Sequence, residues 1–199
     1  MGAVSYIKSS RKVWKCDKCG SIIEKGQPYY RGEINFGPVF IRCKKCRLKP
    51  YEVTTSEFKR SIGELLDTWE ETYSLDECGI EDLISALEEI RDDQQDRLDN
   101  MPEQLQESSS GEILQERIDM LESVIDDLSN IDIDSIKDDA VDNCDELHSD
   151  DPDGDSYDIA YDDVLEFSNY SSDIKSALVE YFESEVRDQI DSALSNLEY

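Results

Sequence analysis

The stretch Cys16-Asp17-Lys18-Cys19-Gly20 and a second stretch, Cys43-Lys44-Lys45-Cys46, decide the fold of the first part of this chain. Four thiolates from two CxxC pairs can close a tetrahedral zinc site, and four sulfurs leave no coordination position open for a substrate. Gly20 can adopt the positive φ angle that such a metal-binding turn often needs. The spacing therefore predicts a structural zinc ion held by the four cysteines of these stretches.

Paired cysteines have other uses, which the surrounding sequence disfavours. A redox CxxC motif normally lies at a strand–helix junction of a βαβ unit, and no such unit is predicted here. Disulfides need an oxidising compartment, and residues 1–8 contain no apolar signal-peptide segment. An iron–sulfur cluster is the remaining, less favoured alternative to zinc.

The residues around the cysteines predict a small β module over residues 12–54. Ile22-Ile23 indicates a short strand, while residues 28–34 and 38–42 read as a hairpin linked by Asn35-Phe36-Gly37. The second hairpin strand leads directly into Cys43. Because so small a module has little core, zinc would supply much of its folding free energy, ~10–16 kcal/mol in zinc-finger peptides.

The charge of the chain is divided between its two parts. The 199 residues carry a formal net charge of −29 with 38% hydrophobic residues, a composition that favours helical surfaces over one large core. Residues 1–60 hold 14 Lys/Arg and 5 Asp/Glu, whereas residues 61–199 hold 6 and 44, a net charge of −38. No apolar run has transmembrane length, so we expect a soluble cytoplasmic protein that makes no membrane contact.

Residues 55–130 predict a helical hairpin with a coiled-coil character. Helices are expected over residues 56–73, 79–100 and 111–129, from apolar positions spaced three and four apart. Polar Gln94 interrupts the stripe of the second helix. We interpret the stripe of the third helix as the hairpin's own core, with a homodimer seam as the alternative; its residues are Leu114, Ile118, Leu121, Ile125 and Leu128.

Residues 131–199 are predicted to form an acidic helical tail. The loop from His148 to Asp155 resembles a calcium-binding loop, but Ala160 stands where that loop needs a bidentate glutamate. A solvated acidic loop is therefore the better interpretation. Helices are expected over residues 158–168 and 171–197, the second with a broad apolar face.

The fold class predicted from these patterns is mainly α with a small β zinc module, of the zinc-ribbon or treble-clef type. Four segments are expected: a mobile basic arm at residues 1–11, the four-cysteine module at 12–54, the helical hairpin at 55–130 and the acidic tail at 131–199.

The order CxxCGxxIxKGxxYY…RCxxC, followed by PxxxTTS and a helix, resembles a widespread family of small bacteriophage and prophage proteins. The resemblance covers roughly residues 12–130 and implies a phage origin, a zinc-ribbon-like head and a coiled-coil body, but no activity. It rests on Cys16, Cys19, Gly20, Ile23, Lys25, Gly26, Tyr29, Tyr30, Cys43, Cys46, Pro50, Thr54, Thr55, Ser56, Asp99, Asn100, Met101, Pro102, Leu105, Gln106, Glu116, Arg117, Leu121 and Glu122.

The sequence contains no recognisable catalytic motif. GxSxG, P-loop and GxGxxG patterns are absent. The one histidine, His148, lies among aspartates, where a solvated side chain is the more common role. Cys78 and Cys144 are isolated, and we expect both to be small buried apolar residues. The chain is therefore predicted to be non-enzymatic, with no catalytic residue.

Two binding hypotheses follow, and the first places nucleic acid on the basic head. Lysines and arginines would contact phosphates, and aromatic side chains, including Tyr29 and Phe40, would stack on unpaired bases. The alternative is that these cations only offset the thiolate charge. The main candidates are Lys12, Trp14, Lys15, Lys18, Tyr30, Arg31, Arg42, Lys44, Lys45 and Arg47.

The second and favoured hypothesis makes the acidic body the functional surface. Rows of carboxylates could imitate DNA phosphates and occupy a host DNA-binding protein, such as a defence nuclease or a transcription factor. The alternatives are a solvated acidic face and salt adaptation, although the Lys-rich head and the Ile-rich body count against the latter. The candidates are Glu88, Glu89, Asp92, Asp93, Asp126, Asp127, Asp138, Asp139, Asp162 and Asp163.

Overall fold

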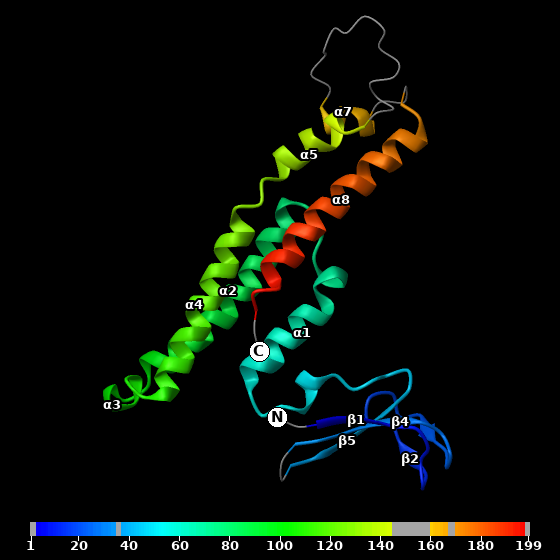
Figure 1. The fold of residues 1–199 in the computed structure, drawn as a ribbon, viewed down its shortest axis with the longest axis vertical. Coiled ribbons are helices and arrows are strands. Elements are labelled where there is room, and N and C mark those ends of the chain that lie inside the picture. The colour runs from blue at the N-terminus through cyan, green and yellow to red at the C-terminus, as the bar shows by residue number, and fades with distance from the viewer. Residues whose placement is uncertain (1–2, 35–36, 145–159, 167–169, 198–199) are drawn as a thin grey trace, which may run out of the picture. The chain divides into compact units, whose positions relative to one another are not determined.

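The computed structural model describes residues 3–34, 37–144, 160–166 and 170–197. The chain divides into two compact units, Met1–Thr68 and Trp69–Glu198, which we call the N-terminal unit and the helical unit (Figure 1). The described residues are mainly helical, with a small antiparallel sheet and a cluster of four cysteines in the N-terminal unit. At this level the predicted fold class is confirmed.

A three-stranded antiparallel sheet forms the centre of the N-terminal unit, in the order β1-β4-β5 (Figure 1). Its strands are β1 (Ala3–Ile7), β4 (Tyr29–Glu33) and β5 (Val39–Cys43). The β4–β5 pair is the predicted hairpin, and its register places Tyr29 opposite Cys43. The end of β5 that carries Cys43 is therefore fixed by ladder hydrogen bonds to β4.

Strand β1 differs from the mobile arm expected for residues 1–11. Ala3–Ile7 pairs along the whole of β4, with Ile7 opposite Tyr29. Ile7 packs against the core of the unit, and the ring of Tyr6 lies 5.0 Å from that of Tyr30, centroid to centroid. The strand covers an edge of β4 that would otherwise be left unpaired, and an unpaired edge is unfavourable.

A two-stranded β-ribbon and a small hydrophobic core complete the β-structure of the N-terminal unit. Strands β2 (Trp14–Lys15) and β3 (Ile22–Ile23) are antiparallel. The core beside them consists of four buried residues: Cys16, Ile23, Tyr29 and Ile41. Of these, Cys16 is a candidate metal ligand. Cys16 therefore also supplies part of the apolar packing.

The segment after the second CxxC pair packs on the sheet. The 3₁₀ helix η1 (Pro50–Val53) lies so close to β4 that a Cβ atom on Gly32 would come within 2.5 Å of Val53 Cγ1. Leu48 and Val53 are both buried there. Helix α1 (Glu57–Thr72) follows, and the boundary between the two units falls within it, after Thr68.

Helices α2 (Glu77–Asp99) and α4 (Ser109–Ser129) form an antiparallel pair in the helical unit, joined through the short helix α3 (Glu103–Gln106) (Figure 1). The predicted stripe from Leu114 to Leu128 is buried within this unit, with every member at most 8% exposed. The use of this stripe as the hairpin's core is therefore observed in the single chain, while the homodimer seam stays a prediction.

The C-terminal helices are part of the same unit. Helix α5 (Ile133–Asp142), α7 (Tyr161–Glu166) and α8 (Ser172–Leu194) follow α4, and α8 packs against α4 and α5 (Figure 1). The rings of Tyr161 and Phe182 lie 5.3 Å apart. The predicted tail is thus built into the core of the unit. The loop from His148 to Asp155 lies outside the described residues.

One buried polar group lies between the paired helices. The Gln94 side chain is fully buried in α2, and its Oε1 accepts a hydrogen bond of 3.1 Å from Arg117 Nη1 on α4. Gln94 Nε2 donates to Asp93 Oδ2 at 2.9 Å. Burial lowers the pKa of the Arg117 guanidinium. A polar contact at one layer of an apolar seam favours a single register of the two helices.

Candidate metal centre

The first CxxC pair lies in the turn that joins β2 to β3. The Cys16 N–H donates to the Ser21 carbonyl at 2.9 Å, and the Gly20 N–H donates to the Cys16 carbonyl at 2.9 Å. Gly20 has a φ angle of +72°, in the left-handed region that a residue without Cβ adopts without strain. The predicted role of Gly20 is therefore observed.

The second CxxC pair begins on the last residue of β5 and turns in a similar way. The Cys46 N–H donates to the Cys43 carbonyl at 3.1 Å. Arg47 then has a φ angle of +32°, the one positive value among the described non-glycine residues. Arg47 occupies the same place after its CxxC pair as Gly20 does after the first. In both turns the residue directly after the second cysteine therefore has a positive φ angle. In the first turn it is a glycine, and in the second it is Arg47, which has a Cβ atom.

The four sulfurs lie close enough together to hold a metal ion. All four Sγ atoms lie within 4.8 Å of one another, and the sulfurs of Cys19 and Cys43 are 3.7 Å apart. A tetrahedron with zinc–sulfur bonds of 2.3 Å has edges of about 3.8 Å. All cysteines of the chain are free thiols rather than disulfides. The donor set and its geometry fit a thiolate-bound metal ion.

Hydrogen bonds to the sulfurs set their acidities. The Cys43 N–H donates to Cys16 Sγ at 3.3 Å. Burial opposes ionisation of Cys16, but N–H donors from Cys19, Cys43 and Lys18 lower its pKa overall. Ser21, whose hydroxyl lies 3.2 Å from Cys19 Sγ, lowers the pKa of Cys19 to about 6. Hydrogen bonding to other cysteine sulfurs, chiefly that of Cys19, raises the pKa of Cys46 to about 12.

Asp17 fastens the first turn to β5, a role that the sequence patterns did not indicate. Its Oδ2 accepts a hydrogen bond of 2.6 Å from the Ile41 N–H, and its own N–H donates to the Ile41 carbonyl at 2.9 Å. Arg42 Nη1 lies 3.6 Å from the same carboxylate, and its Nη2 lies 3.3 Å from Glu52. These contacts bring the two CxxC pairs together.

Exposed lysines lie on and beside the turns that carry the four cysteines. Several other residues predicted to contact nucleic acid instead make contacts within the protein. Arg42 is only 11% exposed in its side chain, Tyr29 is buried, and Arg31 pairs with Glu33 at 2.9 Å. Trp14 is half-buried against Tyr29, with Lys12 Nζ 4.0 Å from its ring centroid. The exposed cations at and beside the metal-binding turns are Lys12, Lys15, Lys18, Lys44, Lys45 and Arg47.

The carboxylates predicted as a partner surface lie on four helices of the helical unit. Nine of the ten are exposed, and Glu88 is half-buried. Some are paired within the unit: Asp93 lies 3.0 Å from Arg97 Nε, and Asp162 lies 3.2 Å from Lys137 Nζ. The structure thus presents these carboxylates to solvent on α2, α4, α5 and α7.

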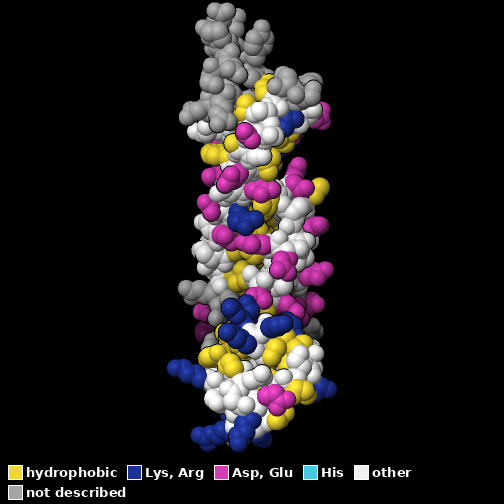
Figure 2. Space-filling model, turned by 90° about the vertical axis from the view of Figure 1, so that its right-hand side faces the viewer, with side chains coloured by type: hydrophobic (Ala, Val, Ile, Leu, Met, Phe, Trp, Pro, Cys, Tyr) yellow, Lys and Arg dark blue, Asp and Glu magenta, His cyan; other side chains and the backbone are white. Residues whose placement is uncertain are grey.

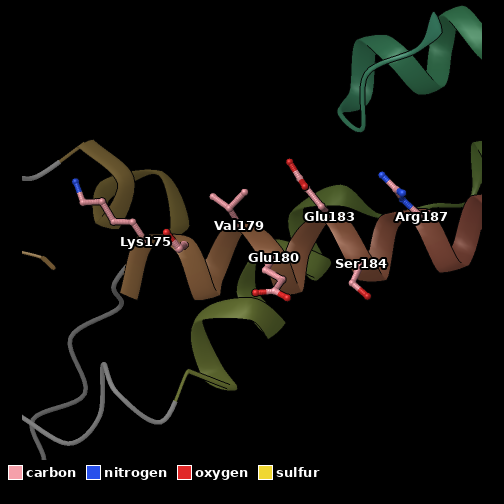
Figure 3. Close-up of a pocket in the computed structure, with 7 residues that line it drawn as sticks. Lys175, Val179, Glu180, Glu183, Ser184 and Arg187 are labelled. Carbon is pink, nitrogen blue, oxygen red and sulfur yellow. The ribbon is translucent and has the colours of Figure 1, made fainter. Parts of the chain in front are cut away.

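Within the described ranges, the hollow along α8 and the two isolated cysteines bring no reactive groups together. A shallow hollow of about 610 Å³ follows α8, where Val179, Glu183 and Arg187 point to the same side of the helix (Figure 3). Cys144 is buried as expected, but Cys78 is exposed in the first turn of α2. The expectation for Cys78 is wrong because Cys78 lies on the solvent side of α2, roughly opposite the buried Ile80, Leu83 and Leu87. Among the described residues, the four cysteines are the one group arranged to hold a metal.

Comparison of the chain with family models, with curated proteins and with solved structures found no match. Within the described residues, none of the helices combines the length and the apolarity that a membrane span requires.

Proposed function

We propose that this is a non-enzymatic zinc-binding protein of phage type whose acidic helical unit binds a basic surface of a host DNA-binding protein. In this proposal the N-terminal unit is a zinc-ribbon-like or treble-clef-like module. The four-sulfur donor set supports zinc, because soft thiolate ligands in a closed tetrahedral site favour structural zinc. The residues quoted above for the family resemblance support the phage origin.

The observation that carries the proposal is that the lysine and arginine side chains of the helical unit contact polar groups of that same unit. Residues 69–199 contain six Lys/Arg and 42 Asp/Glu. Each of the six contacts a group of the same unit: Arg91 with Glu88 and Asp92, Arg97 with Asp93, Arg117 with Gln94, Lys137 with Asp162, Lys175 with the Leu165 carbonyl, and Arg187 with Glu70.

The excess carboxylates therefore face solvent along the helices. Figure 2 shows Asp and Glu side chains spread along the visible face of the helical unit, with few cations between them. Such a surface creates a negative potential that attracts cationic partners. Successive helical turns are about 5.4 Å apart, and phosphates along one DNA strand are about 3.4 Å apart. These two spacings match only loosely, so the charge of the surface is what supports a partner that binds duplex phosphates with arginine and lysine side chains.

The test is retention of a host protein by charge variants of the full chain. We expect the variant with Asn at Asp92, Asp93, Asp126 and Asp127 to retain at most about a tenth of the partner that the native protein retains at about 0.15 M salt. Duplex DNA added as a competitor should displace the partner from the native protein.

The matched control neutralises four other exposed carboxylates, which lie in α3, at its end and in the first part of α4: Glu103, Glu107, Glu112 and Glu116, each changed to Gln. This variant changes the net charge by the same amount. Equal loss of the partner in both variants would indicate a general charge effect. Unchanged retention by the Asp92/Asp93/Asp126/Asp127 variant would contradict the proposed surface.

A second candidate function is nucleic-acid binding by the N-terminal unit. The observation that favours it is the set of exposed cations on the two metal-binding turns, where Lys18, Lys44 and Lys45 stand between the paired cysteines. In this case the acidic helical unit would regulate binding or support dimerisation. The two candidates use different units, so charge changes in one unit test each candidate separately.

A further inference from the structure

One row of side chains crosses the three-stranded sheet and carries two aromatic rings. Tyr6 lies opposite Tyr30, and Tyr30 lies opposite Arg42. The rings of Tyr6 and Tyr30 are 5.0 Å apart at a tilt of 53°. Tyr6 is 46% exposed although it lies in a strand. A pair of tyrosines therefore presents an aromatic surface to solvent on this face of the sheet.

The rest of this face is covered, which limits the open part to the tyrosine end. Leu48 and Val53 pack over the neighbouring row at Gly32. Arg42 is held by Asp17 and Glu52 and does not itself offer a free charge. The open aromatic surface thus consists of Tyr6 and the accessible part of Tyr30.

Exposed lysines flank this surface. The row lies next to the end of the sheet at which Ile7 and Cys43 stand opposite Tyr29. Lys8 follows β1 and Lys44 follows β5 at that same end, and both are exposed. Figure 2 shows further Lys and Arg side chains gathered on the N-terminal unit. An aromatic surface with cations at its border is complementary to a chain of bases and phosphates.

We propose that Tyr6 and Tyr30 form a stacking site for unpaired bases, with Lys8 and Lys44 contacting the flanking phosphates of a single-stranded nucleic acid. Bases in a duplex are stacked on one another and cannot lie against a tyrosine on a flat sheet, whereas every unpaired base offers its π face. This inference deepens the second candidate function and is independent of the proposed acidic surface.

The experiment measures fluorescence anisotropy of labelled oligothymidine of about 12 nucleotides with the zinc-loaded full chain at about 50 mM salt. A hairpin duplex of equal length is the second probe. We expect the single strand to bind more tightly than the duplex. Tyr6→Leu should weaken single-strand binding by at least about fivefold without changing the salt dependence of binding. Tyr6→Phe should retain the native single-strand affinity, because phenylalanine keeps the aromatic ring. Lys44→Gln should reduce the salt dependence.

Tyr181→Leu is the matched control, because Tyr181 is a 37% exposed tyrosine on α8. It should leave binding unchanged. Zinc content and thermal unfolding show whether each variant keeps its fold. Photocrosslinking of a 4-thiothymidine oligonucleotide to the native protein needs no variant, and the crosslink should map to the peptides that contain Tyr6 or Tyr30.

The outcomes separate the two ideas. Native single-strand affinity in a folded Tyr6→Leu variant, or a crosslink confined to other peptides, would overturn the stacking site and leave lysine-mediated binding in place. Absence of binding to both probes would overturn the stacking site and the second candidate function together, without bearing on the acidic helical unit.

Discussion

The β part of the N-terminal unit and the helical unit differ in how much apolar packing they contain. The core cluster beside the β2–β3 ribbon has four buried members, one of them Cys16, and two further cysteines pack against it. The helical unit buries long stripes of leucine, isoleucine and valine from α2, α4 and α8. A small β module cannot bury enough apolar area to offset the entropy lost on folding. A metal ion can supply the difference in the first unit, and side-chain packing supplies it in the second.

This comparison predicts that metal removal unfolds one unit and spares the other. Cys43→Ser should abolish stoichiometric zinc and unfold the N-terminal unit, since metal binding contributes ~10–16 kcal/mol in zinc-finger peptides. The helical signal in far-UV circular dichroism should fall only slightly, because the helical unit does not contain the ligands. Zinc content by mass spectrometry and hydrogen exchange by peptide measure the two effects.

The control for this experiment is Cys78→Ser, which removes an exposed cysteine outside the cluster. It should retain one zinc ion per chain and native exchange in both units. Stoichiometric zinc in the Cys43→Ser protein would show that this cysteine is not a ligand. Loss of protection in α2 and α4 would break the comparison by making the helical unit depend on the metal.

A smaller effect is expected from the buried polar layer at Gln94 in the helical unit. Gln94→Leu keeps similar volume but removes the acceptor that Arg117 Nη1 contacts at 3.1 Å. Loss of one partner of a buried hydrogen bond costs about 1–3 kcal/mol, so the unfolding temperature of this unit should fall. Adding Arg117→Met should recover most of the loss, because replacing both partners by apolar groups is nearly neutral.

A double-mutant cycle on thermal unfolding measures the coupling between Gln94 and Arg117. Ile113→Leu, at an exposed position of α4, is the control and should leave the transition unchanged. Additive effects of the two substitutions would show that the buried glutamine does not act through Arg117. The cycle therefore determines whether this layer of the helical unit depends on polar pairing or on packing alone.

The smallest effect concerns Gly20 and Arg47, the residues with positive φ angles directly after the two CxxC pairs. Arg47→Gly should be more stable than Arg47→Ala by about 1 kcal/mol, because a Cβ atom is unfavourable at a φ angle of +32°. Gly20→Ala, at +72°, should destabilise the N-terminal unit by a similar amount. The midpoint of unfolding during titration with a zinc chelator measures both differences. Equal stability of Arg47→Gly and Arg47→Ala would show that the second turn carries no backbone strain.

Local patterns were sufficient for much of the molecule. The cysteine spacing indicated the cluster whose four sulfurs lie within 4.8 Å of one another. The three-and-four spacing of apolar residues indicated α1, α2, α4 and α8 to within two or three residues at each end. Both signals depend on neighbours along the chain, because a CxxC turn and one face of a helix are built from residues a few positions apart.

Pairing between distant residues could not be predicted in the same way. The segment Ala3–Ile7 contains Val4, Tyr6 and Ile7, residue types that favour strands. It precedes a basic stretch, and the sequence did not show that β4 has an unpaired edge to which this segment could pair. Asp17 is a spacer residue within a CxxC motif, and its role appears only when Ile41 of β5 lies beside it. Tyr6, which stood outside the predicted binding residues, joins the candidate surface only through its pairing with Tyr30.

The sequence by itself therefore determined the four-cysteine cluster, the β4–β5 hairpin and the helices α1, α2, α4 and α8, because each follows from short-range spacing. The tertiary structure decided which polar groups are internal: Arg42 beside the metal-binding turns and Gln94 between α2 and α4. It also decided that α8 packs on α4 and α5. The physical reason is that burial and hydrogen bonding between distant segments depend on how whole elements pack, which no local pattern encodes.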